Sequence, residues 1–130
     1  MQRIYDFLKQ AGTYYLATVD GDQPRVRAFG TVDIYNGKLG IQTGKKKELF
    51  AQISKNPKVE ICAVRGGEWI RVCGSLYPDD SIDACEHMLG NYPELRPMYT
   101  PGDGNCVVLY FEHGTATISS FTALPVTIEF

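Results

Sequence analysis

Three consecutive lysines, Lys45–Lys47, follow a Thr43–Gly44 turn and precede a segment whose apolar residues have helical spacing. We expect these lysines to open a helix that ends at Asn56–Pro57, because proline cannot continue a helix. Cations are unfavourable in a first helical turn, since the free N–H groups and the positive end of the helix dipole attract anions there. A phosphate group among the lysines would turn this unfavourable charge into a binding site. The alternative is a run of solvated lysines.

Two arginines, Arg25 and Arg27, lie at the start of a long predicted strand that runs from about Arg25 to Tyr35. Their spacing places both side chains on one face of that strand. Asn36–Gly37 is the strongest hairpin signal in the sequence, and folding the chain there brings Thr43 near the level of the arginines. The hairpin therefore predicts that the arginines and the lysine turn meet at one end of a sheet.

The remaining elements follow from hydrophobic periodicity and turn residues. We expect a helix at Gln2–Ala11, a helix capped within Pro78–Ser81 and ended by Gly90, and strands at Tyr14–Val19, Lys38–Gln42, Val59–Val64, Trp69–Tyr77, Cys106–Glu112, Thr115–Phe121 and Val126–Phe130. The last long hairpin would turn at His113–Gly114. These elements predict one mainly β domain over residues 1–130, an antiparallel barrel of six or seven strands with short helices. Strand number alone does not separate a barrel from a sandwich, but an open sheet would leave exposed edges.

The composition is that of an ordinary globular protein, with 130 residues, 44% hydrophobic residues, 22% charged residues and a net charge of −2. A slightly acidic chain does not suit a general nucleic-acid binder, which carries a basic excess. No apolar run approaches the ~20 residues that span a membrane, and no signal peptide opens the sequence. The four cysteines have no zinc-type spacing, so we expect free, mostly buried thiols and a cytoplasmic protein.

Several familiar catalytic motifs are absent. Gly40–Lys45 resembles a phosphate loop but is one residue short between its glycines and lacks Ser or Thr after the lysine. His87 falls on the polar side of a predicted helix and His113 in a predicted turn, where we expect surface histidines rather than members of a catalytic triad. The aspartates at Asp79–Asp80 are explained as helix capping rather than as metal ligands.

Three motifs occur in a particular order: Pro24–Arg27 on a strand, Thr43–Lys47 at a turn and Asn56–Val59 after a helix. Together they resemble the pyridoxamine 5′-phosphate oxidase-like family of FMN-binding split barrels, and the resemblance runs from the first strand to the last hairpin. In that family an arginine-bearing strand, a Thr or Ser turn and a lysine near the helix start hold the flavin phosphate and ring. The resemblance therefore implies a split β-barrel with FMN as its cofactor.

The resemblance implies a set of cofactor-binding residues, which are Arg25, Val26, Arg27, Gln42, Thr43, Lys46, Lys47 and Trp69. The arginines would contact the phosphate or the ribityl chain, and the backbone around Val26 would approach the flavin ring. The glutamine and threonine would offer hydrogen bonds, and one of the two lysines would pair with the phosphate. Trp69 would line the flavin pocket, from its own or a second subunit, or serve as a core or interface aromatic.

The resemblance also implies a homodimer with FMN at the interface and an oxidoreductase that acts on a small molecule. The chain is much shorter than true pyridoxamine phosphate oxidases and lacks the arginine–histidine elements that hold their substrate, so we do not expect that reaction. Smaller family members include flavin reductases, nitro-group reductases and flavoproteins of unknown role. Two alternatives stay open: a non-catalytic flavin- or haem-binding module that stores or senses, and a barrel that binds single-stranded nucleic acid, which the acidic charge disfavours.

Overall fold

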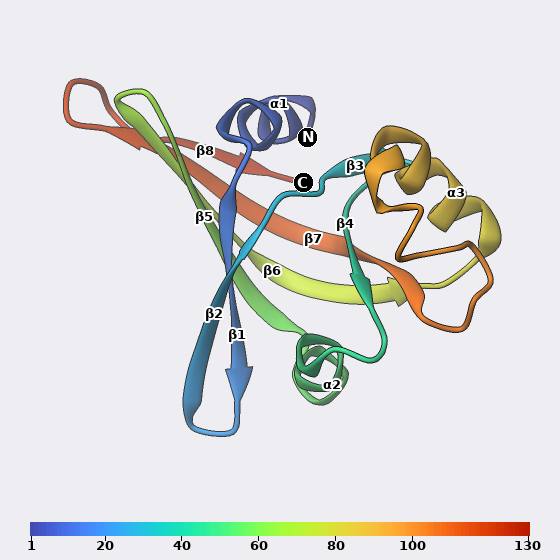
Figure 1. The fold of residues 1–130 in the computed structure, drawn as a ribbon. Coiled ribbons are helices and arrows are strands. Elements are labelled where there is room, and N and C mark those ends of the chain that lie inside the picture. Colours follow the sequence, from blue (N-terminus) through green and yellow to red (C-terminus); the bar gives the residue numbers. More distant parts are fainter.

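Eight antiparallel strands form one curled sheet in the computed structural model, which describes residues 1–130 (Figure 1). The hydrogen-bonded order is β2-β1-β5-β6-β7-β4-β3, and β8 pairs with β7 beside this path. The elements are α1 Gln2–Ala11, β1 Tyr14–Asp20, β2 Gln23–Phe29, β3 Asp33–Tyr35, β4 Lys38–Gly44, α2 Glu48–Lys55, β5 Lys58–Arg65, β6 Glu68–Asp79, α3 Ile82–Asn91, the 3-10 helix η1 Pro93–Leu95, β7 Cys106–Ser120 and β8 Val126–Glu129. The mainly β, antiparallel split barrel is confirmed, with eight strands where six or seven were predicted.

The two ends of the sheet path, β2 and β3, are separated in the chain only by the residues 30–32. Seven strands side by side in a flat sheet would hold these ends roughly 29 Å apart. The chain from Phe29 to Asp33 reaches at most about 14 Å. The sheet must therefore curl until its ends approach each other. The single strand predicted from Arg25 to Tyr35 is wrong for this reason, since its first half pairs with β1 and its second half with β4.

Two tyrosines hold the short link between β2 and β3. The hydroxyl of Tyr14, a fully buried residue of β1, donates a hydrogen bond to the carbonyl oxygen of Thr31 at 2.6 Å. The hydroxyl of Tyr92, which follows α3, accepts from the Val32 amide at 3.0 Å and donates to the Val32 carbonyl oxygen at 3.2 Å. The backbone groups that leave the strand ladder at the link are thus satisfied by side chains from two distant segments.

Two helices cover the ends of the barrel and pack on its core, and the third packs on its outside. Apolar residues of α1 and α2 belong to the same core cluster as the inward-facing strand residues, and in Figure 1 the two helices lie at opposite ends of the barrel. The third helix, α3, packs outside the barrel, where Cys85 and Met88 take part in two small clusters with β7 residues. Ser81 caps α3 by accepting the Ala84 amide, as the sequence predicted. None of these helices has the length and apolar character needed to cross a membrane.

The hairpin predicted across His113–Gly114 does not exist, because β7 continues without a turn from Cys106 to Ser120. Gly114 lies opposite Gly74 of β6, next to an irregularity in the pairing of the two strands. A Cβ atom at Gly114 would lie 2.5 Å from the Phe130 ring, and one at Gly74 would lie 2.6 Å from the His113 carbonyl oxygen. These glycines therefore serve close packing between strands rather than a turn.

All four cysteines are free, as the sequence predicted, but only Cys85 and Cys106 are buried. Burial raises the pKa of the Cys85 thiol to about 12. Cys62 and Cys73 are exposed on the outer face of β5 and β6, so the expectation of mostly buried thiols is half right.

The Tyr14 hydroxyl gives a direct test of how much the link contributes to stability. We expect Tyr14→Phe to lower the free energy of unfolding by about 1–2 kcal/mol, because the Thr31 carbonyl loses its donor. Denaturant titration measures the change. Tyr5→Phe is the matched control, since Tyr5 packs against the core without a side-chain hydrogen bond, and it should change stability by less than about 0.5 kcal/mol. Equal effects of the two substitutions would contradict an anchoring role for Tyr14.

Candidate functional site

The Arg27 guanidinium is a partly buried positive charge that forms no ion pair with a carboxylate. Its Nη1 donates to the Leu16 carbonyl oxygen at 3.1 Å and to Thr18 Oγ1 at 2.8 Å, and its Nη2 donates to Gln52 Oε1 at 2.8 Å. Burial lowers the pKa of Arg27, repulsion from Arg25 lowers it further, and the nearby Glu48 carboxylate partly offsets both effects. A half-buried guanidinium with only neutral partners favours the approach of an anion.

The lysine run forms a turn before α2 and does not open the helix. The helix begins at Glu48, and Lys47 is its N-cap residue, in extended backbone conformation. The prediction was wrong because the acidic Glu48, not a lysine, is the first residue of the first turn, as the helix dipole favours. Lys45 pairs with Asp80 at 2.6 Å. The Lys46 and Lys47 side chains are exposed and form no ion pair, so two cations remain free beside the start of α2.

The loop before β7 holds the lysine turn in place. The Lys45 amide donates to the Asn105 carbonyl oxygen at 2.8 Å. The Lys46 amide donates to the side-chain Oδ1 of Asn105 at 3.0 Å. The Asp103 carboxylate organises this loop by accepting the backbone amides of Thr100, Asn105 and Cys106 at 2.7–2.9 Å. These backbone hydrogen bonds, that of Thr100 first, lower the pKa of Asp103.

The helix α2 brings the arginine strand and the lysine turn together. Gln52, on this helix, contacts Arg27, and Lys47 lies at the start of the same helix. Arg27 and the lysine turn are thus both attached to α2 and are not joined by strand pairing, because β2 and β4 do not pair. Beside it lies a cavity of about 260 Å³, lined by Gln42 and Lys47 together with Ala28, Phe29, Gly30, Thr31, Leu95, Met98 and Tyr99.

Two of the other residues singled out from the sequence, Arg25 and Val26, do not line this cavity. Arg25 pairs with Asp20 at 3.1 Å, and both side chains are exposed at the β1–β2 turn. Val26 is exposed on the outer face of β2, whose outer edge has no neighbouring strand. Their positions fit an outer border of the site rather than its wall.

Thr43 and Trp69 complete the predicted set. Among buried side-chain nitrogen and oxygen atoms, only the Thr43 hydroxyl oxygen lacks a hydrogen-bond partner. Such an unpaired group is costly unless a ligand or water reaches it. Trp69 lies at the β5–β6 turn, with its ring 5.1 Å from that of Phe121. In Figure 1 this turn lies at the opposite end of the sheet from α2, so within one chain Trp69 does not join the other candidates.

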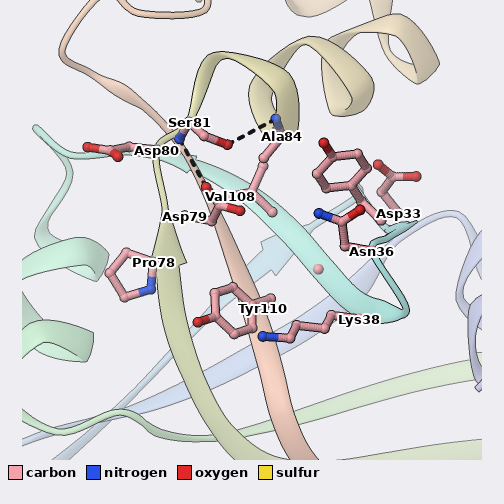
Figure 2. A pocket seen from close by; sticks show the side chains of 12 residues that line it. Asp33, Asn36, Lys38, Pro78, Asp79, Asp80, Ser81, Ala84, Val108 and Tyr110 are labelled. Atoms are coloured by element: carbon pink, nitrogen blue, oxygen red, sulfur yellow. Dashed lines mark hydrogen bonds between the residues drawn. The ribbon is translucent and has the colours of Figure 1, made fainter.

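A second cavity, also of about 260 Å³, lies between the β3–β4 hairpin and the start of α3 (Figure 2). Its charged groups have partners inside the protein. Asp33 contacts His87 Nδ1 at 2.6 Å and Asn91 at 2.9 Å, and Asp79 accepts the Ser81 amide, as the dashed line in Figure 2 marks. Lys38 lies 4.2 Å above the Tyr110 ring. With three aspartates and one lysine in its wall, this cavity does not favour an anion, unlike the cavity beside α2.

Four residues of the site were not found from the sequence: Thr18, Gln52, Tyr99 and Asn105. Gln52 lies at a helix position that the sequence analysis did not consider, and a polar residue between Leu49 and Ile53 could have indicated a buried partner. The Asp103–Gly104–Asn105 segment is a typical turn sequence, but nothing local shows that it contacts the lysines. The contacts of Gln52 and Asn105 join residues 25 and 59 positions apart, so their discovery requires the fold, whereas Thr18 lies only nine positions from Arg27 across the β1–β2 hairpin.

Comparison with known proteins gives one family. The family model described as pyridoxamine 5′-phosphate oxidase matches residues 1–84. A NimC/NimA family protein from Clostridium acetobutylicum is 44% identical and superposes with a TM-score of 0.96, over 100% of this chain and 92% of that one. No protein in the search of curated sequences matches.

Two more distant structures share the fold. General stress protein 26 from Bacillus anthracis is 19% identical, with a TM-score of 0.73 over 98% of this chain and 97% of that chain. A pyridoxamine 5′-phosphate oxidase-related, FMN-binding protein from Nostoc punctiforme is 15% identical, with a TM-score of 0.60 over 99% of this chain and 95% of that chain.

Asp103 makes the loop beside the lysine turn sensitive to acid. A carboxylate whose folded-state pKa is lowered contributes stability above its ordinary pKa of about 3.9, and this contribution is lost as the pH falls through the lowered value. We therefore expect Asp103→Asn to be less stable than the parent protein at pH 7, with a difference that shrinks as the pH falls below about 4. Urea unfolding midpoints at several pH values measure this difference.

The control for this experiment is Asp22→Asn, because the Asp22 carboxylate is exposed in the β1–β2 turn and makes no hydrogen bond. It should match the parent protein at pH 7. A stability difference for Asp103→Asn that stays constant from pH 7 to pH 2 would contradict the role given to its charge.

Proposed function

The chain belongs to the pyridoxamine 5′-phosphate oxidase-like family, and from this premise we propose that it is an FMN-binding oxidoreductase that acts on a small molecule. The observation that carries the proposal is a group of three cations around the start of α2, Arg27, Lys46 and Lys47, none of which forms an ion pair with a carboxylate. When bound, FMN supplies the redox chemistry, and the protein supplies position and electrostatics. No side chain need act as a nucleophile.

The chemistry of these residues fits the phosphate end of the cofactor. Lys46 and Lys47 are exposed cations without ion pairs. The hydrogen-bond partners of Arg27 are neutral, so none of them cancels its positive charge. Charge-assisted hydrogen bonds to phosphate are the strong ones, and helix N-termini favour anions. The Thr43 hydroxyl lacks a partner, but Thr43 is buried and does not line the cavity, so this proposal assigns it no direct contact with the cofactor. In this proposal Arg25 contributes at longer range from the outer border.

The cavity beside α2 fits the remainder of the cofactor. Its wall includes the backbone of Ala28–Thr31, the amide side chain of Gln42 and the apolar surfaces of Met98 and Tyr99. Ligand pockets of this kind combine apolar walls with a few polar groups that fix orientation. In this proposal the Gln42 side chain and the unpaired outer edge of β2 near Val26 form hydrogen bonds with the flavin ring.

We further propose that the protein is a homodimer through the outer face of its sheet. The strand register puts Val26, Tyr15 and Val64 on this face, and each is more than half exposed. Trp69 pairs with Val64 and so lies on the same face. Two-fold association of these faces would bring Trp69 of one chain toward the outer border of the site in the other chain, near Val26. Two-fold dimers are the commonest oligomers.

The phosphate assignment predicts a difference between FMN and riboflavin, which lacks the phosphate. We expect the double substitution Lys46→Ala with Lys47→Ala, and separately Arg27→Ala, to weaken FMN binding about 10- to 100-fold, because each charged hydrogen bond contributes about 1.5–3 kcal/mol. Riboflavin should bind the parent protein poorly and change little in the variants. Isothermal titration with both ligands measures the effect.

The matched control removes two cations at and beyond the other end of α2, Lys55 at its last residue and Lys58 at the first residue of β5, through Lys55→Ala with Lys58→Ala, and should leave FMN affinity nearly unchanged. Equal losses for FMN and riboflavin would assign the residues to the fold or the ring pocket. No loss of affinity for either ligand would show that Lys46 and Lys47 are solvated lysines without a role in binding. A Soret band in place of flavin absorption in the purified protein would support the haem-binding alternative.

The dimer is tested by light scattering coupled to size-exclusion chromatography. We expect twice the chain mass of 14.5 kDa for the flavin-loaded protein. Val64→Lys, which puts a charge into the proposed interface, should shift the population toward the single chain because an unpaired charge is costly to bury. A mass of 14.5 kDa with flavin bound would contradict the proposal.

A further inference from the structure

Arg27 belongs to a closed triangle of side chains that joins three elements. Its Nη1 donates to Thr18 Oγ1 of β1 at 2.8 Å, its Nη2 donates to Gln52 Oε1 of α2 at 2.8 Å, and the Thr18 hydroxyl donates to the same Oε1 at 2.6 Å. Thr18 is 3% exposed and Gln52 is 8% exposed. Every contact is a geometrically good hydrogen bond, so the guanidinium has a defined orientation.

The triangle uses only part of the hydrogen-bonding capacity of Arg27. A guanidinium has five N–H donors. Two of them, on Nη1, contact Leu16 and Thr18, and one on Nη2 contacts Gln52. The donor on Nε and the second donor on Nη2 have no partner in the protein. The geometry therefore fixes one side of the group and leaves two donors for a ligand.

The hydrogen-bond partners of Arg27 are all neutral, whereas four of the other five arginines pair with a carboxylate; the fifth, Arg3, is exposed and forms no side-chain hydrogen bond. Arg25, Arg65, Arg71 and Arg96 each pair with a carboxylate. A glutamate at position 52 would hold the guanidinium as closely as glutamine does, because the two side chains have nearly the same shape. It would also cancel the charge that the ligand needs. The amide of Gln52 satisfies both requirements.

We propose that Gln52 and Thr18 are positioning residues that hold Arg27 for the cofactor phosphate while leaving its charge uncompensated, and that they thereby set the preference for FMN over riboflavin. This inference rests on the proposed function. It adds that discrimination between the two flavins depends on the neutrality of a residue that need not touch either ligand.

The decisive variant is Gln52→Glu, because it keeps the shape and the acceptor oxygens of the side chain while adding a negative charge. We expect FMN affinity to fall at least 10-fold and riboflavin affinity to stay within about twofold, since only the phosphate responds to the lost charge. The urea midpoint of the ligand-free protein should be unchanged or higher, because the new carboxylate forms an ion pair with Arg27. A merely structural role for Gln52 does not predict this combination.

The matched control is Gln10→Glu on α1. Gln10 Oε1 also accepts from an arginine, Arg65 Nη1, at 2.7 Å, so the substitution makes the same charge change in the same type of contact away from the site. It should leave both affinities as in the parent protein. An equal loss of FMN affinity in the two variants would show an effect of net charge alone and would overturn the inference.

A second variant, Thr18→Val, tests positioning without adding charge. It preserves the side-chain shape but removes the hydroxyl that accepts from Arg27. We expect a 3- to 10-fold loss of FMN affinity with little change for riboflavin. This variant decides the question if Gln52→Glu does not fold, because a loss of FMN and riboflavin binding in equal measure would overturn the inference.

The outcomes separate this inference from the proposed function. A parent protein that binds FMN no better than riboflavin would refute the phosphate site itself. A parent protein that prefers FMN, together with a Gln52→Glu variant that keeps the full preference, would refute only the positioning role.

Discussion

The fold depends on one covalent constraint, the three-residue link between β2 and β3. These strands are the two ends of the sheet path, and the link is far shorter than the width of a flat sheet. The sheet is therefore forced to curl, and its interior becomes a core that α1 and α2 complete. The same link leaves the strand ladder, so its backbone needs partners, which Tyr14 and Tyr92 provide.

The constraint that shapes the fold also shapes the candidate site. Because the link passes outside the ladder, its residues form one wall of the cavity beside α2. The preceding strand β2 has a free outer edge, since no strand follows it in the sheet. Closure of the barrel and the open wall of the cavity thus both arise from residues 30–32, where the chain leaves the sheet between β2 and β3. A ligand there would contact backbone that is rigidly held yet not used in the sheet.

Charge is distributed unevenly for a chain with a net charge of −2. Four of the arginines and Lys45 form ion pairs with carboxylates. In the cavity near α3, the Asp33 carboxylate contacts His87. Arg27, Lys46 and Lys47 form no ion pair and lie near the start of α2, whereas the other unpaired cations lie elsewhere in the chain, at Arg3, Lys9, Lys38, Lys55 and Lys58. An acidic protein can therefore present a local anion site without attracting nucleic acid in general. The interior partners of Arg27 are amide, hydroxyl and carbonyl groups, which restrain it without neutralising it.

The sequence by itself determined the features that depend on neighbouring residues. The helix Gln2–Ala11 follows from its periodicity, the hairpin at Asn36–Gly37 from its turn residues and the cap of α3 from Ser81, and the structure confirms all three. The order of the arginine strand, the lysine turn and the Asn–Pro stop was enough to indicate the family. Of the nine residues that line the cavity beside α2, only Gln42 and Lys47 were named from the sequence, together with Arg27 and Lys46 next to it.

Only the tertiary structure decided which strands break and which continue. The run from Arg25 to Tyr35 alternates like one strand, but its halves pair with opposite ends of the sheet. His113–Gly114 reads as a turn, but Gly114 is required for close approach to the Phe130 ring inside a continuous strand. Gln52 and Thr18 are likewise unremarkable in the sequence: Thr18 becomes a partner of Arg27 when β1 pairs with β2, and Gln52 only when α2 packs beside β1. Local propensity describes one segment at a time, whereas strand register and side-chain contacts depend on segments that are distant in the chain.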